Sequence, residues 1–242
     1  MRLIAFVAIG LLFIAQSAGA ASWSVISFAT TPQNAPKVAA AGDKLMASAA
    51  GKTFAGRLVL QVHTADGNDP ATHSWVPIYK SAAQREAFVQ KLQADPAWDA
   101  FLASISQLSQ PVSTVMYRTI KSWGDIQDSD TVWMAHAFNV SDPAAFLAAI
   151  EKFRASPTGQ KFQGQVHVSA VVAGGMSPVS HLISVGYATE AEMEAWANTV
   201  APSKDWADYL DAAQNAAEYL GGSLGRDLKT WGPATLADLT AP

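Results

Sequence analysis

The spacing of apolar residues predicts strands and helices that alternate along the chain. Residues 23–29 (WSVISFA) alternate and are rich in β-branched and aromatic side chains, as a half-buried strand is. Residues 57–63 (RLVLQVH) place leucine and valine on one face, and the polar Gln61 and His63 on the other. Between these strands, the alanine-rich residues 35–50 favour a helix.

The elements that follow complete one unit. The turn-forming residues 66–70 (DGNDP) lead directly into a strand over 73–80, which indicates an antiparallel hairpin. A capped helix over 82–93 and another that begins near Pro96 precede a strand over 113–123. The order βαββαβ predicts an α+β fold of the ferredoxin-like type, with helices on one face of a four-stranded antiparallel sheet.

This pattern occurs twice in the sequence. A long-period self-match indicates that one structural unit is repeated. Shifting the sequence by 108 positions, without a gap, superimposes the following residues on identical ones: Gly51, Phe54, Gly56, Ala65, Gly67, Pro70, His73, Tyr79, Glu86, Ala87, Trp98, Leu102, Arg118, Lys121, Trp123 and Gly124. At the first strand the shift is 110, which aligns Trp133 with Trp23.

We therefore predict two tandem ferredoxin-like βαββαβ modules that form a pseudo-dimeric α/β barrel. Module 1 spans residues 21–124 and module 2 spans residues 131–232, followed by a C-terminal tail over 233–242. The linker, residues 125–130, is short and polar, so we expect the modules to pack together.

Residues 1–20 have the pattern of a secretory signal peptide. Arg2 precedes an almost unbroken apolar run, and Ala18-Gly19-Ala20 fits a cleavage site. The run is too short for a typical membrane-spanning helix. The sequence thus predicts an exported protein, periplasmic or secreted, that does not span a membrane after cleavage.

Composition narrows the function classes. Half of the residues are hydrophobic and 15% are charged, which is typical of a compact globular protein. The chain has no cysteine, so disulfides, thiolate nucleophiles and cysteine-based metal sites are excluded. A net charge of −4 without a Lys/Arg cluster argues against a nucleic-acid partner.

One segment resembles a known family. Residues 79–102 have the sequence YKSAAQREAFVQKLQADPAWDAFL. This segment contains a tyrosine, then a capped helix with the residues R-E-A at its centre, then A-D-P-x-W and F-L. In this order of features it resembles the NIPSNAP family. Residues 187–210 keep Tyr187, Trp206 and Leu210 but lack the D-P pair and the arginine.

The resemblance implies membership of the dimeric α/β barrel superfamily, which includes EthD-like proteins and the antibiotic-biosynthesis monooxygenases. In such proteins two ferredoxin-like sheets face each other and close a barrel. Tandem copies in one chain would supply both halves, an architecture similar to that of the chlorite dismutase-like haem proteins.

The five histidines are the main candidates for chemistry, because imidazole titrates near neutral pH. His73 and His181 occupy equivalent positions in the two copies, which favours a structural role that holds the adjacent turn through a backbone hydrogen bond. His136 and His167 instead replace Ile26 and Val59 of the first copy, so any functional site is predicted in module 2.

Strand alternation suggests where these side chains point. His167 shares a face with Ser169, and His63 shares one with Gln61, and both faces are candidates for the barrel interior. His136 lies on an apolar face that we expect helices to cover, where a hydrogen-bonded core histidine is the alternative to a functional one.

Basic residues on the last strand of each copy are further candidates. Arg118 and Arg226 interrupt apolar rows, so an inward arginine would bind an anionic ligand group. The alternative is an ion pair with Glu86 or Glu194, which are duplicated as well. Lys229 projects to the other face of the same strand.

We expect the protein to bind a small, largely apolar ligand in a pocket within or beside the sheets, as a monomer or homodimer. The ligand-binding candidates are Gln61, His63, Arg118, Ser169 and Lys229. The resemblance implies an alternative, a cofactor-independent oxygenase or haem-handling enzyme, with His136, His167, Tyr187 and Arg226 as catalytic candidates. A non-catalytic structural or interaction protein with a filled barrel is the third possibility. No motif in the sequence specifies a cofactor or a metal.

Overall fold

The computed structural model describes residues 21–174 and 178–240, so the predicted signal peptide lies outside the described residues. Eight strands form a single closed antiparallel sheet. The strands are β1 (Ser22–Thr30), β2 (Arg57–Ala65), β3 (His73–Tyr79), β4 (Ser109–Trp123), β5 (Val132–Val140), β6 (Val166–Gly174), β7 (His181–Tyr187) and β8 (Ala217–Trp231). The helices are α1 (Ala35–Met46), α2 (Ala82–Gln93), α3 (Pro96–Leu108), α4 (Pro143–Ala155), α5 (Glu190–Val200), α6 (Lys204–Ala213) and α7 (Leu236–Thr240), with short 3-10 turns at Gly51–Thr53 and Gly159–Lys161.

The strand order around the barrel is β1-β3-β2-β8-β5-β7-β6-β4. β1 to β4 are contiguous in the barrel, as are β5 to β8, and each set has the same order and connections. We call the elements β1 to α3 and β4 the first half, and β5 to β8 with α4 to α6 the second half. The halves meet where β2 pairs with β8 and where β4 pairs with β6.

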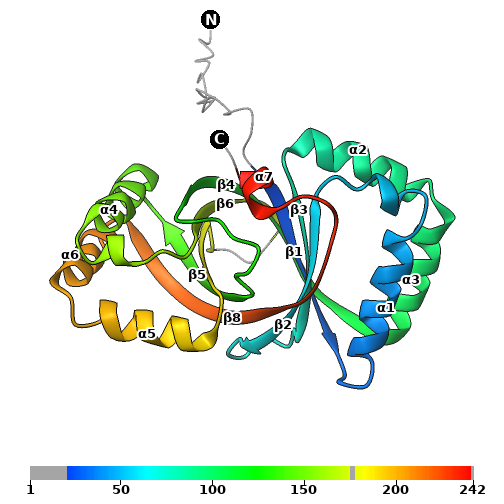
Figure 1. Ribbon diagram of the computed structural model, residues 1–242, viewed down its shortest axis with the longest axis horizontal. Coiled ribbons are helices and arrows are strands. Elements are labelled where there is room, and N and C mark those ends of the chain that lie inside the picture. Colours follow the sequence, from blue (N-terminus) through cyan, green and yellow to red (C-terminus); the bar gives the residue numbers. More distant parts are fainter. Residues whose placement is uncertain (1–20, 175–177, 241–242) are drawn as a thin grey trace, which may run out of the picture.

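The helices lie outside the barrel in two groups. In Figure 1, α1, α2 and α3 cover the first half on one side, and α4, α5 and α6 cover the second half on the other. Helix ends follow the sequence signals: Ser81 caps α2 by accepting a hydrogen bond from the Gln84 amide, and Asp142 caps α4 in the same way. Among the described residues, no helix is both long and apolar enough to cross a membrane.

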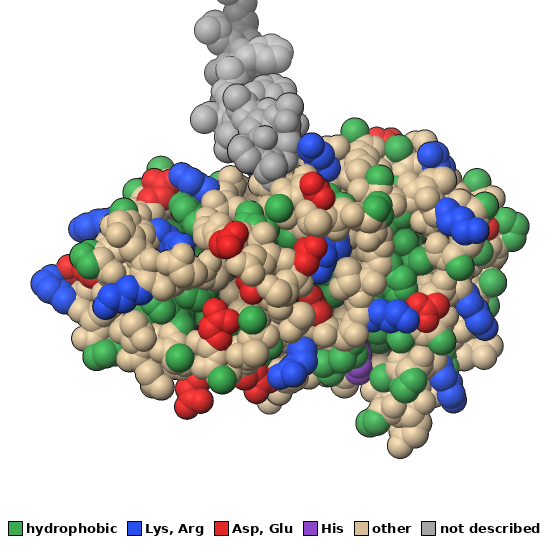
Figure 2. All heavy atoms as spheres, viewed as in Figure 1, with side chains coloured by type: hydrophobic (Ala, Val, Ile, Leu, Met, Phe, Trp, Pro, Cys, Tyr) green, Lys and Arg blue, Asp and Glu red, His purple; other side chains and the backbone are tan. Residues whose placement is uncertain are grey.

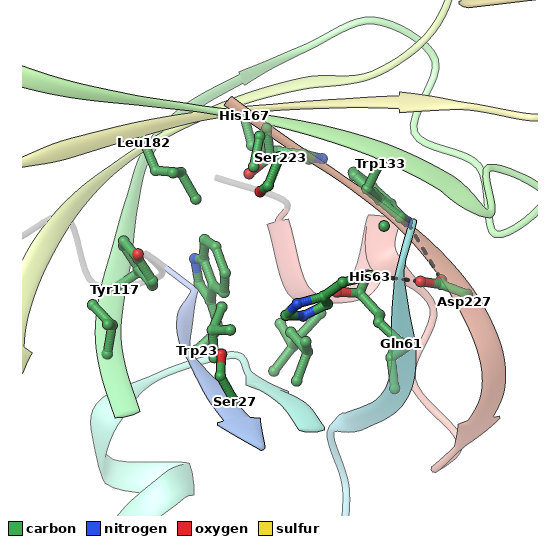
Figure 3. A pocket seen from close by; sticks show the side chains of 18 of the residues that line it. Trp23, Ser27, Gln61, His63, Tyr117, Trp133, His167, Leu182, Ser223 and Asp227 are labelled. Atoms are coloured by element: carbon green, nitrogen blue, oxygen red, sulfur yellow. Dashed lines mark hydrogen bonds between the residues drawn. The ribbon is translucent and has the colours of Figure 1, made fainter. Parts of the chain in front are cut away.

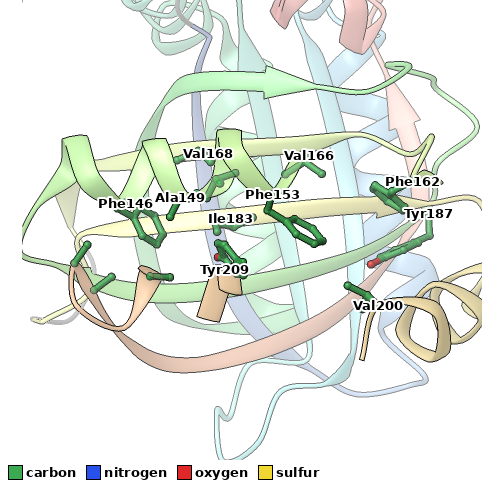
Figure 4. Packing of buried hydrophobic residues seen from close by; sticks show 14 of the residues in the cluster. Phe146, Ala149, Phe153, Phe162, Val166, Val168, Ile183, Tyr187, Val200 and Tyr209 are labelled. Carbon is green, nitrogen blue, oxygen red and sulfur yellow. The ribbon is translucent and has the colours of Figure 1, made fainter. Parts of the chain in front are cut away.

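Alternation along the strands divides the side chains between the barrel interior and the helix-covered outer face. Arg57, Val59, Gln61 and His63 line the interior, as their shared face predicted. Outward-facing residues form the apolar cores with the helices. The core of the second half centres on Phe146, which is 1% exposed, and on the aromatic side chains around it (Figure 4).

The last strand of each half reaches into the core of the other half. Trp231, at the end of β8, packs against Trp75 in the first half, with 5.6 Å between ring centroids. Trp123, at the end of β4, packs against the second-half core. Lys229 and Lys121 anchor these ends by ion pairs to helices of the opposite half, Lys229 to Asp43 on α1 at 2.7 Å and Lys121 to Glu151 on α4.

β4 is longer than the predicted strand over 113–123. It begins at Ser109, directly after α3, and β8 begins at Ala217, with three residues between it and the end of α6, because their first residues pair with the ends of β1 and β5. On the face drawn in Figure 2, Lys and Arg side chains are interspersed with Asp and Glu.

Candidate functional site

The barrel interior encloses a cavity of about 290 Å³ that runs from α7 at one end to the β2–β3 hairpin at the other. Aromatic side chains form much of its wall: Trp23 and Tyr117 stack with 4.5 Å between centroids, and Trp133 lies across from them (Figure 3). The polar and titratable side chains that line it are Ser27, Arg57, Gln61, His63, Asp66, Asp69, Ser113, Thr119, His167, Ser184, Ser223, Asp227 and Thr240.

Asp227, on β8, is the most perturbed carboxyl group in this cavity. It accepts hydrogen bonds from Gln61 Nε2 at 2.7 Å and from Trp133 Nε1 at 3.4 Å (Figure 3). Burial raises its pKa to about 6, although both hydrogen bonds and the charge of Arg57 oppose that shift. A carboxyl group that exchanges its proton near neutral pH is suited to acid–base chemistry or to proton-linked binding.

His63 stands near the hairpin end of the same cavity. Its Nδ1 is 2.6 Å from Asp66 Oδ2 and its Nε2 is 2.8 Å from Ser74 Oγ. Ser74 in turn hydrogen-bonds Ser27 across β1 and β3, at 3.0 Å. Ser74 thus hydrogen-bonds Nε2 of His63, whereas Nδ1 lies close to Asp66 without hydrogen-bond geometry.

His167 is a fully bonded interior residue. Its Nδ1 is 2.7 Å from Ser122 Oγ and its Nε2 is 3.0 Å from Gln165 Oε1. Burial lowers its pKa to about 4, so the ring is neutral at pH 7. Gln165 continues the chain of hydrogen bonds to Asp130 at 2.7 Å, which ties His167 to the segment that joins the halves. Both ring nitrogens of His167 are thus engaged by protein partners.

Ser169, the other interior candidate of the second half, is fully buried. Its hydroxyl donates a long hydrogen bond of 3.5 Å to Thr119 Oγ1 and does not reach the described cavity wall. The repeat places Ser169 at the position of Gln61, and Thr119 at the position of Asp227. The interior therefore carries a carboxyl–amide pair on one side and two hydroxyl groups at the equivalent place on the other.

A second cavity of about 460 Å³ lies between the outer face of β5–β8 and helices α4 to α6. Its wall is mostly aromatic and aliphatic, and parts of that wall are seen in Figure 4. Tyr219 and Leu210, which are 57% and 47% exposed, lie where the cavity opens to the surface. The lining residues are His136, Phe138, Ile150, Phe153, Arg154, Phe162, Val166, Ile183, Val185, Tyr187, Trp196, Trp206, Tyr209, Leu210, Ala213, Gln214, Ala217 and Tyr219.

Few polar groups face this second cavity. His136 Nδ1 is 3.5 Å from the Tyr219 hydroxyl, and burial lowers the pKa of His136, so its ring is neutral at pH 7. Burial raises the pKa of Tyr187 and, to about 12, that of Tyr209. Arg154 donates to the carbonyl oxygens of Gly159 and Phe162, while its buried Nε has no partner.

The first half is filled where the second half is hollow. Trp75 occupies that place in the first half and packs against Phe101, with 6.0 Å between centroids. The residue 108 positions after Trp75 is Ile183, and the residue 108 positions after Ile105 is Ala213. Smaller side chains at these two positions leave room between the sheet and the helices of the second half.

Arg118, Arg226 and Lys229 do not line either cavity, which corrects the expectation of an inward arginine. Alternation directs Tyr117 into the barrel, so Arg118 faces outward. Arg226 also faces outward and pairs with Glu190 at 2.6 Å, not with Glu194.

Replacing Arg226 with Ala should therefore change little. The Arg226–Glu190 pair is about half exposed on both sides, and exposed pairs contribute less than about 1 kcal/mol. Urea unfolding should show a change within that limit, and ligand binding should be unaffected. A large loss of binding in this variant would contradict the outward placement.

The duplicated histidines are structural, although their partners differ from the expected backbone group. His73 Nδ1 is 2.9 Å from Thr72 Oγ1, and His181 Nδ1 is 2.9 Å from Ser180 Oγ. Each hydroxyl belongs to the residue just before the histidine and lies at the start of the strand. Each histidine thus makes the same local hydrogen bond at the start of its strand.

Asp227, Trp23 and Trp133 were not among the candidates chosen from the sequence. For Asp227, the available signal was the self-match of the sequence. Asp227 replaces Thr119 between residues that are identical or similar at the shift of 108. Within residues 21–174 and 178–240, no group of three or more His, Cys, Asp or Glu side chains is arranged to hold a metal ion.

No protein-family model matches the chain, and no curated protein matches it. Solved structures match almost all of it. A Fusobacterium nucleatum subsp. nucleatum protein described as "putative monooxygenase" is 13% identical with a TM-score of 0.61, over 90% of this chain and 97% of that one. An anthrone oxidase-like protein is 10% identical with a TM-score of 0.58, over 94% and 98%. A haem-binding protein from Thermus thermophilus is 8% identical with a TM-score of 0.52, over 87% and 92%.

The fold is that of a dimeric α/β barrel. At these identities the likeness concerns the fold, and function has to be argued from the site. The resemblance of residues 79–102 to the NIPSNAP family stays a prediction from sequence.

Proposed function

We propose that this is an exported protein that binds a small, flat and largely apolar molecule in the cavity of the second half. One observation carries the proposal, a difference between the two halves at equivalent positions. In the first half Trp75 fills the space between the sheet and the helices, whereas in the second half this space is open around Ile183 and Ala213. Empty apolar space costs stability, so a cavity at the place that Trp75 occupies in the first half supports a role in binding.

The polar groups of this cavity favour a ligand with one oxygen substituent. The His136 ring and the Tyr219 hydroxyl meet at the cavity opening, where they can accept from or donate to a phenol or carbonyl group. The aromatic wall suits a fused or planar ring system. Because the eight strands close within one chain and leave no open sheet edge, we also propose that the protein is a monomer.

A second candidate function is oxygenation of such a ligand without a cofactor. Its support is His136, a neutral imidazole in an apolar cavity that could take the proton of a phenol or an activated C–H group. Dioxygen would be the oxidant. The solved structures with this fold include an anthrone oxidase-like protein, which makes anthrone a suitable probe.

A haem is the other group that proteins of this fold suggest. His136 is the one imidazole on the described wall of the cavity, and its Nε2 would be the iron ligand, because Nδ1 faces Tyr219. Bound haem would supply redox chemistry. The residues of this chain would hold it between aromatic side chains and orient the His136 ring.

The test fills the cavity with the residues of the first half. The variant Ile183→Trp/Ala213→Ile should remain folded and lose at least tenfold in affinity for anthrone, about 1.4 kcal/mol. The matched variant His136→Ile, which copies Ile26, should weaken anthrone binding less than the filled variant does, because the apolar wall remains, but should lose any oxygen uptake. Fluorescence quenching measures binding, and an oxygen electrode measures turnover.

Absorbance from 300 to 700 nm of protein purified from its native host separates the candidates further. A Soret band that disappears in His136→Ile would identify haem as the ligand. Unchanged anthrone binding in the filled variant would refute the proposed site.

A further inference from the structure

The barrel interior is the second site of interest, and its charge is predominantly negative. Asp66, Asp69 and Asp227 line this cavity. Arg57 is the one Lys or Arg among the described lining residues, and its Nη1 is already bound to Asp128 at 2.7 Å. A concave, aromatic-walled space with excess carboxylate attracts cations, because the low-dielectric wall strengthens the field.

One aromatic ring contacts the carboxylate of Asp227, and others line the same cavity. The Trp133 indole donates to this carboxylate, and the stacked pair of Trp23 and Tyr117 lies elsewhere on the same cavity wall (Figure 3). Faces of tryptophan and tyrosine attract ammonium groups through their quadrupoles. A cavity that combines this carboxylate with indole and phenol faces is therefore suited to an amine.

Arg57 provides a second, independent indication of a ligand. Its side chain is 8% exposed, and its buried Nε has no hydrogen-bond partner. Unpaired buried donors are rare and costly. Arg57 lines the cavity and is near enough to Asp227 to lower the pKa of that carboxyl group. The cavity thus offers an acceptor at Asp227 and, close to it, the guanidinium group of Arg57.

We infer that the barrel interior binds a small arylalkyl amine that carries an oxygen acceptor at its other end, with the ammonium group at Asp227 and the oxygen at Arg57. The ring of the ligand lies between Trp23, Tyr117 and Trp133. This site is separate from the cavity proposed above, because the two lie on opposite faces of the β5–β8 sheet.

The repeat supports a role for the carboxylate beyond folding. The equivalent position carries Thr119, which hydrogen-bonds Ser169 in place of a charged group. Strand pairing is the same at both positions: the Asp227 amide donates to Thr131 O and the Thr119 amide donates to Ala21 O, at 2.8 and 3.0 Å. The fold therefore does not need a carboxylate at this position.

Four probes test the two ends of the ligand separately by calorimetry at pH 7.5. Tyramine has both the amine and the phenolic oxygen, tyrosol replaces the amine with a hydroxyl group, phenethylamine lacks the oxygen, and 4-hydroxyphenylacetate reverses the charge. We expect tyramine to bind most tightly, with tyrosol and phenethylamine each at least tenfold weaker and no binding of 4-hydroxyphenylacetate. Equal binding of tyramine and tyrosol, or no binding of tyramine at millimolar concentration, would overturn the inference.

Variants locate the site. Asp227→Asn should abolish the preference for tyramine over tyrosol, whereas Asp208→Asn, which removes a surface carboxylate on α6, should keep it. Filling the other cavity with Ile183→Trp/Ala213→Ile should leave tyramine binding unchanged. If that variant loses tyramine and Asp227→Asn does not, the amine binds in the second-half cavity and the inference fails, whatever the outcome with anthrone.

The unmodified protein provides a further check that needs no variant. Tyramine stays cationic below pH 8, so its affinity should fall as pH drops through about 6 and Asp227 takes up a proton. Arg57, His63, Asp66, Asp69 and His167 share the cavity. Of these, Asp66 has its pKa raised by burial and His167 is neutral above pH 4. An affinity that is constant from pH 5 to 8 would contradict a role for Asp227.

Discussion

Replacing Asp227 with Asn should stabilise the protein by about 1–3 kcal/mol at pH 8 and have little effect at pH 4. The folded-state pKa of Asp227 is about 6, above the ordinary value of 3.8. The folded protein therefore holds this proton more tightly than the unfolded chain, and the stability it provides is lost as pH rises from 3.8 to 6. Each pKa unit corresponds to about 1.4 kcal/mol, and imperfect pairing of the new amide with Trp133 reduces the gain.

The contribution of His167 to stability changes with pH in the opposite direction, over almost the same pH range. Its folded-state pKa of about 4 lies below the ordinary 6.5, so its contribution is complete above pH 6.5 and is lost as pH falls to 4. In the unmodified protein the two slopes largely cancel between pH 4 and 6. The Asp227→Asn variant should therefore reveal an acid-induced loss of about 3 kcal/mol.

His167→Gln is the matched variant, because glutamine removes the titrating ring and can keep one hydrogen bond to Ser122 or Gln165. Its stability should decrease as pH rises from 4 to 6. Urea unfolding at half-unit steps from pH 4 to 8 measures all three proteins. Parallel profiles for the two variants would show that these groups do not titrate as their burial indicates.

Gly124→Ala and Gly232→Ala should each destabilise the protein by about 3 kcal/mol or more. Both glycines have positive φ, 91° and 97°, a region where a side chain costs about 1–2 kcal/mol. A Cβ at Gly124 would overlap the carbonyl oxygen of Gly164 in the other half, and a Cβ at Gly232 would overlap that of Gly56. Backbone must move in either case, which adds to the cost.

Gly67→Ala is the control for the backbone conformation alone. Gly67 has φ of 60° and open space around its Cβ position, so its replacement should cost about 1 kcal/mol. Urea unfolding compares the three variants. If the two junction variants are no less stable than Gly67→Ala, the close contacts between the halves do not contribute as inferred.

The local pattern of the sequence was sufficient to predict most of the secondary structure. Helix 82–93 begins after Ser81 and ends where expected, and β3 (His73–Tyr79) ends one residue before the predicted bound of 80. Capping side chains and period-two alternation act between residues close in sequence, so they can be recognised without tertiary information. The inward face of β2, with Gln61 and His63, was predicted for the same reason.

The self-match of the sequence predicted at which positions the two halves differ. It did not predict which sites the differing side chains form. His136 and His167 were both recognised as departures from the first copy, yet one lies under the helices and the other inside the barrel. His167 meets Ser122 and Gln165 through contacts between separate strands. Sequence spacing contains no information about such partners.

By itself, the sequence determined the order of strands and helices, the repeat and the division of each strand into two faces, because these depend on local propensity and period. Only the tertiary structure decided which face is the interior, that Arg226 pairs with Glu190, and that Asp227 meets Gln61 and Trp133. Those contacts join residues as many as 166 positions apart. They arise from barrel closure, which sets the register between β2 and β8 and the burial that shifts each pKa.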